Sequence, residues 1–219
     1  MTTRREQGIT LLEIAVVVAF IGVMSSIAMP ALDGLFTDQR AKGAARSVSD
    51  AFSLGRAEAI RTGNTHLVVF QGALSSGAPI AIVNDGAPDS SNCSVDPGEV
   101  VHTVGAPADV SWGTSTGLSN GTAAPDDPGM ASSGVATGSS FTDASLVPVN
   151  LANWVLFEPD GLPRLFTPNG SNCGAVGLAG QGGGSIYLTN TRRDYAIVLS
   201  PLGTSRVHVW DSQLDTWRN

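Results

Sequence analysis

Lysine is almost absent from this sequence, in which Lys42 is the only one. Charged residues make up 14% of the 219, and 19 acidic residues against 12 basic ones give a net charge of −7. General nucleic-acid binders need clustered Lys and Arg to neutralise phosphates, so this class is disfavoured. The low charge also excludes a charged disordered chain and a coiled coil. Apolar residues, at 42%, suffice for a sizeable core.

One long apolar run stands near the start of the chain. Residues 9–29 contain a single charged residue, Glu13. As a helix this run is about 30 Å long, the thickness of the hydrocarbon layer of a bilayer. Arg4 and Arg5 precede it, so the positive-inside tendency places the start of the chain in the cytoplasm and everything after Pro30 across the membrane.

Two simpler interpretations of this run are open. A cleaved secretory signal is one, because Ser26-Ile27-Ala28 resembles a cleavage site of small residues. The apolar part of a signal is usually only about 7 to 15 residues long, however, and has no use for a carboxylate. A plain membrane anchor is the other, and it leaves Glu13 as an unexplained cost of about 2.5 to 3.5 kcal/mol deep in lipid.

The residues around the start of the run match a specific motif. The sequence GITLLE at 8–13 resembles the processing site of type IV pilins and type II secretion pseudopilins, in which a short basic leader ends in Gly, an apolar residue follows and Glu comes soon after. Phe is commoner in that family at the position of Ile9. Pro30 falls where many members of the family carry a proline.

This resemblance implies a processing and assembly pathway. A prepilin peptidase would cut between Gly8 and Ile9 and methylate the new amine of Ile9. The partner expected for Glu13 is this amine, either on a neighbouring subunit or four residues away on the same chain. The other expected partners are minor and major pilins or pseudopilins, and the inner membrane before assembly. The resemblance implies a single-pass inner-membrane protein with a periplasmic head, which enters a periplasmic pseudopilus or a cell-surface pilus after assembly.

The predicted fold class is α+β, with a long N-terminal helix packed on an antiparallel β-sheet head, as in type IV pilins. The helix is expected over 9–62, because apolar residues continue at three- and four-residue spacing after Pro30 and Gly63-Asn64 supplies a stop. The expected organisation is a leader at 1–8, a transmembrane and assembly helix at 9–30, an amphipathic scaffold at 31–64, and a head at 65–219 whose low-complexity part, 113–145, is expected to be a long mobile surface loop.

Short β-branched runs separated by Gly, Pro, Ser and Asn fill the head. They predict strands at 66–70, 80–83, 100–104, 153–157, 163–166, 185–189, 195–199 and 206–210. In order along the chain, the residues at 55–61, 157–161, 185–188 and 197–207 look like the GspH/FimT family of minor pilins and pseudopilins. This resemblance implies a non-enzymatic minor subunit that helps to initiate or cap a type IV pilus or a type II secretion pseudopilus.

DNA binding is an alternative function, because some FimT-like proteins bind DNA through a Gly-Arg-x-Arg sequence near their end. Here the five residues after Gly203 include only one arginine, Arg206, although Arg192 and Arg193 could join it in one patch. From residue 65 onward there are five arginines and 13 acids, so the head should repel a polyanion at long range. DNA is therefore disfavoured as a partner.

The two cysteines, Cys93 and Cys173, fall in predicted loops, on the side of the membrane where disulfides persist. A bridge between them is expected, with two unpaired thiols as the alternative. The four acids between residues 85 and 99 could gather around Ca²⁺, but they lack the alternate spacing of a calcium loop. Solvated loop charges are the preferred interpretation, and no metal or other cofactor is expected.

A search for catalytic residues favours no enzyme. The sequence GTSTG at 113–117 fits a nucleophile elbow, but no helix is predicted after it, and a secreted hydrolase is disfavoured accordingly. His66, His102 and His208 are isolated in the sequence, which favours packed or surface histidines over ligands. Trp210 and Trp217 either anchor a protein partner or cover a sheet edge, and the sequence leaves both interpretations open.

Overall fold

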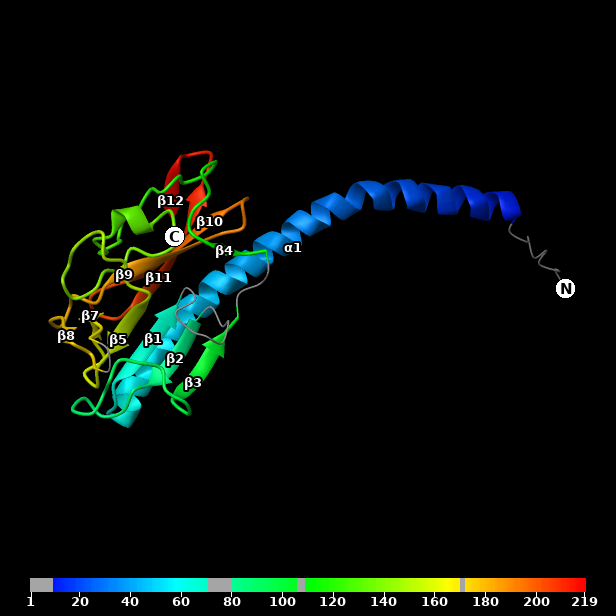
Figure 1. Ribbon diagram of the computed structural model, residues 1–219. Helices are drawn as coiled ribbons and strands as arrows, with labels where there is room; N and C mark the ends of the chain where they lie inside the picture. Colours follow the sequence, from blue (N-terminus) through cyan, green and yellow to red (C-terminus); the bar gives the residue numbers. More distant parts are fainter. Residues whose placement is uncertain (1–9, 71–79, 106–108, 170–171) are drawn as a thin grey trace. The chain divides into compact units, whose positions relative to one another are not determined.

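The computed structural model describes residues 10–70, 80–105, 109–169 and 172–219, and within its helix it describes no side chains for 27–32 (Figure 1). The chain separates into two compact units, Met1–Thr37 and Asp38–Asn219. The long helix α1 (Leu11–Thr62) contributes to both of them. In the first unit, the described part consists of the start of α1 and Thr10 before it.

In the second unit, α1 presents one apolar face to the core. The buried residues recur at three- and four-residue intervals, as an amphipathic helix requires: Ala41, Ala44, Ala45, Val48, Ala51, Phe52 and Ala59. Gly55 lies on the same side, where an added Cβ would come within 2.7 Å of Cγ2 of Val68. The helix ends at Thr62, and Gly63 takes a left-handed conformation and donates its N–H to the carbonyl of Ala59.

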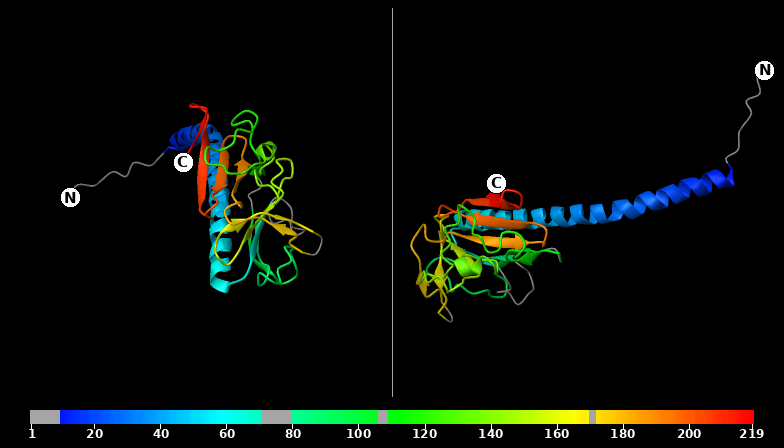
Figure 2. Two further views of the ribbon diagram at one scale, coloured as in Figure 1. Left: turned by 90° about the vertical axis from the view of Figure 1, so that its left-hand side faces the viewer. Right: turned by 90° about the horizontal axis from the view of Figure 1, so that it is seen from above.

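The strands form three antiparallel sheets. Sheet A has the order β3-β2-β1-β5-β6 and is formed by β1 (His66–Phe70), β2 (Ile80–Asn84), β3 (Val100–Val104), β5 (Trp154–Phe157) and β6 (Pro163–Arg164). Sheet B has the order β12-β11-β10-β9-β4 and is formed by β4 (Ser111–Trp112), β9 (Gly184–Thr189), β10 (Asp194–Leu199), β11 (Ser205–Asp211) and β12 (Thr216–Arg218). The third sheet pairs β7 (Phe166–Thr167) with β8 (Ala175–Val176). Figure 2 shows β10 and β11 running alongside the later part of α1.

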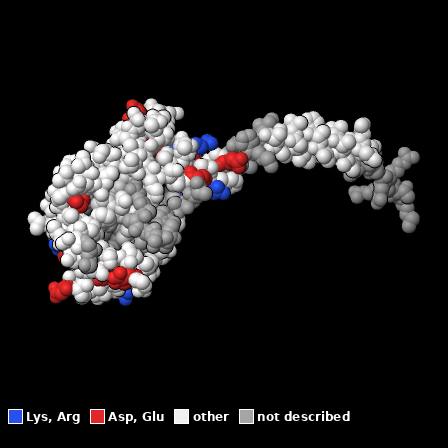
Figure 3. Space-filling view, in the orientation of Figure 1, with Lys and Arg blue, Asp and Glu red and all other residues white. Residues whose placement is uncertain are grey.

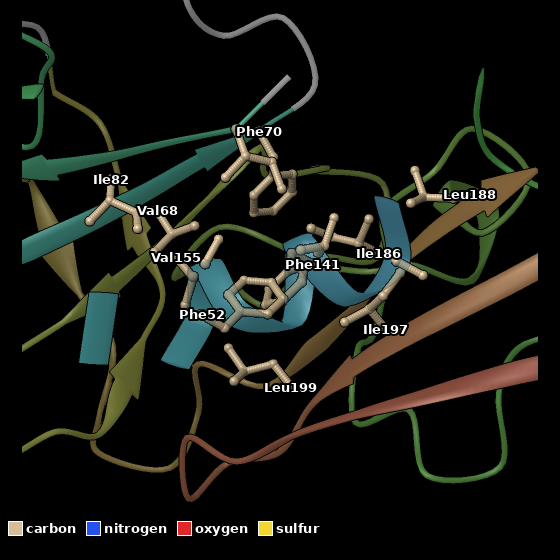
Figure 4. Packing of buried hydrophobic residues seen from close by; sticks show 14 of the residues in the cluster. Phe52, Val68, Phe70, Ile82, Phe141, Val155, Ile186, Leu188, Ile197 and Leu199 are labelled. Carbon is tan, nitrogen blue, oxygen red and sulfur yellow. The ribbon is translucent and has the colours of Figure 1, made fainter. Parts of the chain in front are cut away.

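Side chains alternate between the two faces of a strand. In each five-stranded sheet, both faces carry buried apolar side chains. Val68 and Ile82 of sheet A, with Ile197 of sheet B, share one cluster with α1 (Figure 4). On its other face, sheet A packs Leu67, Val69, Ala81, Val83 and Leu156 against Phe166. The other face of sheet B carries a third cluster: Ala124, Val135, Tyr187, Ala196, Val198, Trp210 and Trp217. The core therefore has one central layer around α1 and two outer layers.

The predicted fold class is wrong. We expected a long N-terminal helix on one sheet, as in type IV pilins, whereas the chain after the helix is organised in three sheets. In α1 itself, side chains are described for two parts, 11–26 and 33–62, of 16 and 30 residues. The physical reason for the separate sheets is that β1 pairs with β2 and β5, while β10 pairs with β9 and β11, so none of the strands described here joins the two groups.

The predicted transmembrane span is also corrected. Among the described residues, no helix combines the length and the apolar character needed to cross a bilayer. The expected single-pass inner-membrane location with a periplasmic head is accordingly not supported.

The strand predictions are confirmed for β1, β2, β3, β5, β9, β10 and β11, with shifts of one residue at some ends. The run predicted at 163–166 is divided between β6 and β7, and β4, β8 and β12 were not predicted.

The segment 113–145, expected to be a surface loop, contributes side chains to the core. Its only element in the described structure is a 3₁₀ turn, Ser132–Gly134, yet Ala131, Val135 and Phe141 within it are fully buried. The ring of Phe141 lies 6.1 Å from that of Phe52 and 5.3 Å from that of Phe70, between the helix and sheet A (Figure 4). The segment therefore supplies core side chains while its backbone remains irregular.

Candidate assembly surface

The first described part of α1 exposes apolar side chains in every direction. All residues of 11–26 are exposed, and the large apolar side chains range from 47% exposed at Val16 to 86% at Leu11. Val16, Val17 and Val18 are consecutive, and each step turns a helix by about 100°, so this stretch has no polar face. Its visible side is white in Figure 3. We call residues 11–26 the apolar helix surface.

A helix that is apolar all round is normally buried, and an exposed apolar patch marks an interaction site. The polar residues of the apolar helix surface are few: Glu13, Ser25 and Ser26. Ser26 donates its hydroxyl to the carbonyl of Val23 at 2.7 Å, so it is satisfied within the helix. The arrangement is suited to packing against other apolar surfaces rather than to chemistry on a substrate.

The start of α1 carries a cap that the sequence-based predictions did not include. The backbone N–H of Glu13 donates to Oγ1 of Thr10 at 3.2 Å, which places Thr10 as the N-cap of α1. Thr10 and Glu13 have the Thr-x-x-Glu spacing of a capping box, the signal that would have revealed this contact. The side chain of Glu13 is exposed, so its carboxylate is also available to a second subunit.

The processing residues lie outside the described part of the chain. Gly8 and Ile9 are not among the described residues, and neither is the side chain of Pro30, although Pro30 falls within α1. Cleavage after Gly8 and the pairing of Glu13 with the amine of Ile9 stay predictions.

The three arginines considered for DNA binding do not form one patch. Arg193 contacts Asp38 at 3.1 Å and Arg192 lies 3.9 Å from the same carboxylate, whereas Arg206 pairs with Asp126 at 3.1 Å. Arg206 faces Val198 in the register of β10 and β11, four residues along β10 from its start at Asp194, which is about 13 Å. Each arginine thus has a carboxylate partner, and the two groups lie at different ends of β10.

The predicted disulfide is confirmed, since Cys93 and Cys173 are bonded. Asp85 lies beside the pair, but the two sulfur atoms are bonded to each other and are not free thiolates for a metal. Asp85 is 3% exposed and accepts the backbone N–H groups of Asn92 and Cys93, at 3.2 and 2.8 Å. Burial raises the pKa of Asp85, and these two hydrogen bonds oppose that shift. This acid organises the loop, whereas Asp89 and Asp96 are exposed.

The remaining motifs are structural where the chain is described. Oγ of Ser115 accepts the N–H of Gly117 at 3.4 Å, and the N–H of Ser115 donates to Asp194. His66 and His208 are buried, and burial lowers the pKa of both imidazoles, while His102 is exposed on β3.

The two tryptophans are part of the outer layer of sheet B. Trp210 and Trp217 are opposite each other in β11 and β12, each 7% exposed, with ring centroids 5.3 Å apart and planes at 76°. Nε1 of Trp217 donates to the carbonyl of Thr122 at 3.0 Å. Of the two interpretations left open by the sequence, the structure favours the cover of a sheet edge.

Comparisons of the chain with family models, curated proteins and solved structures find no match. None of them points to a pilin or to secretion.

Proposed function

We propose that this chain is a non-enzymatic minor subunit of a filament of the type IV pilin or pseudopilin kind, which helps to initiate or cap the fibre and joins its neighbours through the apolar helix surface. The observation that carries the proposal is the exposure of every residue of 11–26, including Leu12, Val17 and Phe20. Burying large apolar side chains of this kind contributes roughly 1.5–3 kcal/mol each. Such a surface is best covered by helices of the same character from other subunits.

The motif at 8–13 supports the same proposal from the sequence. Cleavage between Gly8 and Ile9 by a prepilin peptidase would place a new amine close to Glu13. Once apolar helices pack together, an acid among them requires a positively charged partner. The amine of Ile9 on a neighbouring subunit meets that requirement, so Glu13 would set the register between subunits.

The test is the mature N-terminus of the chain recovered from sheared fibres after co-expression with a prepilin peptidase and a major subunit. Mass spectrometry should find a chain that begins at N-methylated Ile9. A chain that begins elsewhere, or that never enters the fibre fraction, contradicts the proposal.

Two substitutions separate the role of the Glu13 charge from that of the cap. Glu13→Gln keeps the backbone N–H that Oγ1 of Thr10 accepts, and Gln suits this position of a capping box as Glu does, but the substitution removes the negative charge. Thr10→Ala removes the cap and keeps the charge. If Glu13 pairs with a neighbouring amine, Glu13→Gln is cleaved normally but enters fibres about tenfold less, whereas Thr10→Ala enters them nearly as well as the wild type. Normal incorporation of Glu13→Gln would show that the charge has no such role.

A further inference from the structure

A hollow of about 540 Å³ lies at the end of sheet B where β10 begins. Arg192, Arg193 and Arg218 line it, above Trp210 and beside Asp211. The three arginine side chains are 53–60% exposed. We call this the arginine hollow.

The arginine hollow has more positive than negative side-chain charge. Its three guanidinium groups share two carboxylates, since Arg192 and Arg193 both face Asp38 and Arg218 pairs with Asp211 at 2.8 Å. The turn that carries the first two is fixed, because the N–H groups of Arg192 and Arg193 both donate to Oδ1 of Asn190, at 3.0 and 2.7 Å. Counted over these side chains, three positive charges therefore stand against two negative ones.

A segment of the opposite charge occurs elsewhere in the same unit. Residues 85–99, which we call the acidic loop, contain four acids and no Lys or Arg. The disulfide Cys93–Cys173 and the hydrogen bonds to buried Asp85 hold this loop in place, while Asp89 and Asp96 remain exposed. A preordered loop loses little conformational entropy on binding.

The two features lie at opposite ends of the part of α1 that belongs to the second unit. The arginine hollow adjoins Asp38, at the start of that part. The acidic loop follows β2 at the other end, where Nδ2 of Asn64 donates to Oδ1 of Asn84 at 3.0 Å. From residue 38 to residue 62 the helix rises about 36 Å. Figure 3 shows acidic side chains at the lower end of the molecule, where α1 ends.

We propose that the acidic loop of one copy of this chain docks in the arginine hollow of the next copy. Because the two surfaces differ and lie at opposite ends, the contact is head-to-tail, and such contacts form rings or open rows rather than closed dimers. This inference rests on the proposed function. It adds that a short head-to-tail row of copies would give the start of a fibre a defined polarity. Two copies of net charge −7 repel each other at long range, so the contact depends on these charge pairs at short range.

Charge exchange tests the contact. One variant carries Arg192→Glu and Arg193→Glu, and a second carries Asp89→Arg and Asp96→Arg. Both are made in full-length chain that also carries Ile14→Ser and Val18→Ser, so that association through the apolar helix surface is weakened equally in every sample. Self-association is measured by sedimentation velocity at about 0.15 M salt, where the Debye length of about 8 Å screens distant charges but not contacts.

Each variant alone should self-associate at least about tenfold more weakly than its parent, because like charges then face each other in the contact. An equal mixture of the two should recover to within about threefold of the parent, because each hollow now meets a loop of opposite charge. Two single controls, Arg206→Glu and Asp50→Arg, each change the net charge in the same direction as one of the variants, at an exposed residue outside both surfaces, and each should behave as the parent.

Unchanged self-association in both variants, or a mixture no tighter than either variant alone, would overturn the head-to-tail contact. So would calorimetric binding of inorganic phosphate to the parent but not to the arginine variant, in the absence of any self-association, since the hollow would then be a site for a small anion. None of these results bears on the mature N-terminus or on entry into fibres through α1, so this inference and the proposed function fail separately.

Discussion

Ser119 holds the carboxylate of Asp194 through two hydrogen bonds to Oδ2, one from its backbone N–H at 3.1 Å and one from its hydroxyl at 2.6 Å. The N–H of Ser115 donates to both oxygens of the same carboxylate, each at 3.1 Å. Asp194 opens β10 and is 0% exposed. A buried carboxylate is tolerated only when its oxygens accept such bonds. This acid therefore ties the irregular segment 113–145 to sheet B.

Asp194→Asn should lower the free energy of unfolding by about 2–4 kcal/mol, because the amide group turns a donor toward the donors of Ser115 and Ser119. Urea unfolding followed by circular dichroism measures the change. Asp50→Asn, on the exposed side of α1, is the matched control and should stay within about 0.5 kcal/mol of the wild type. A loss below that size in Asp194→Asn would contradict the role given to this carboxylate.

The disulfide should contribute substantially to stability, because it closes a loop between residues separated by 80 positions. The chain-entropy model gives up to about 4.5 kcal/mol for a loop of this length. Replacing both Cys93 and Cys173 by Ser should lower the urea midpoint, and reductant should lower the midpoint of the wild type but not that of the double variant. An unchanged wild-type midpoint in reductant would show that the bridge adds nothing.

Two Gly→Ala substitutions should have opposite effects. A Cβ at Gly184 would lie 2.7 Å from ring atoms of Phe141, so Gly184→Ala must displace a buried side chain and should cost about 1–3 kcal/mol. Gly43 lies in α1 with nothing within 4 Å of an added Cβ, and Gly43→Ala should stabilise the helix by about 0.5–1 kcal/mol. Thermal unfolding of the two variants checks the sign of each effect. Equal melting temperatures would mean that Phe141 is not packed against β9 as described.

Stability should fall as the pH drops below about 6.5, because burial lowers the pKa of His66 from its ordinary value of 6.5. The unfolded chain then binds the proton more readily than the folded one does, so the loss begins at the unfolded pKa and levels off below the folded pKa. In urea unfolding between pH 8 and pH 5, His66→Gln should reduce this dependence, whereas His102→Gln, at an exposed position of β3, should not. The same slope in His66→Gln and the wild type would rule out His66 as its source.

The sequence predicted the strands that consist of short β-branched or aromatic runs, because a run such as HLVVF at 66–70 is typical of a strand. It also predicted the partner of Cys93, since only one other cysteine exists. It did not predict β4 or β8, each of which has only two residues and no periodicity to detect. Phe141 was missed as a core residue because its neighbours are polar or small, and burial there depends on contacts with Phe52 and Phe70, far away in the sequence.

The division into two large sheets could not be predicted from local patterns. Whether β5 pairs with β1 or with β9 depends on contacts between segments distant in the sequence. The residue pattern within each strand gives no information on these contacts.

The candidate assembly surface was predicted only in part. Its apolar run was evident, but the same composition is expected of a helix in a bilayer and of a helix packed against other apolar helices, so the pattern alone does not identify the partner. The arginine hollow was missed because Arg218 joins Arg192 and Arg193 through the pairing of β11 with β12.

The apolar helix surface is proposed to join this chain to other subunits, and the decisive measurement is the fraction of chain that pellets with sheared fibres. Ile14→Ser combined with Val18→Ser makes two positions of that surface polar, whereas Leu214→Ser changes a side chain of similar exposure in the second unit: the three are 54%, 61% and 61% exposed. We predict that the helix variant is processed normally but that its pelleted fraction falls about tenfold or more, while Leu214→Ser matches the wild type. Equal pelleting of the helix variant and the wild type would contradict assembly through this surface.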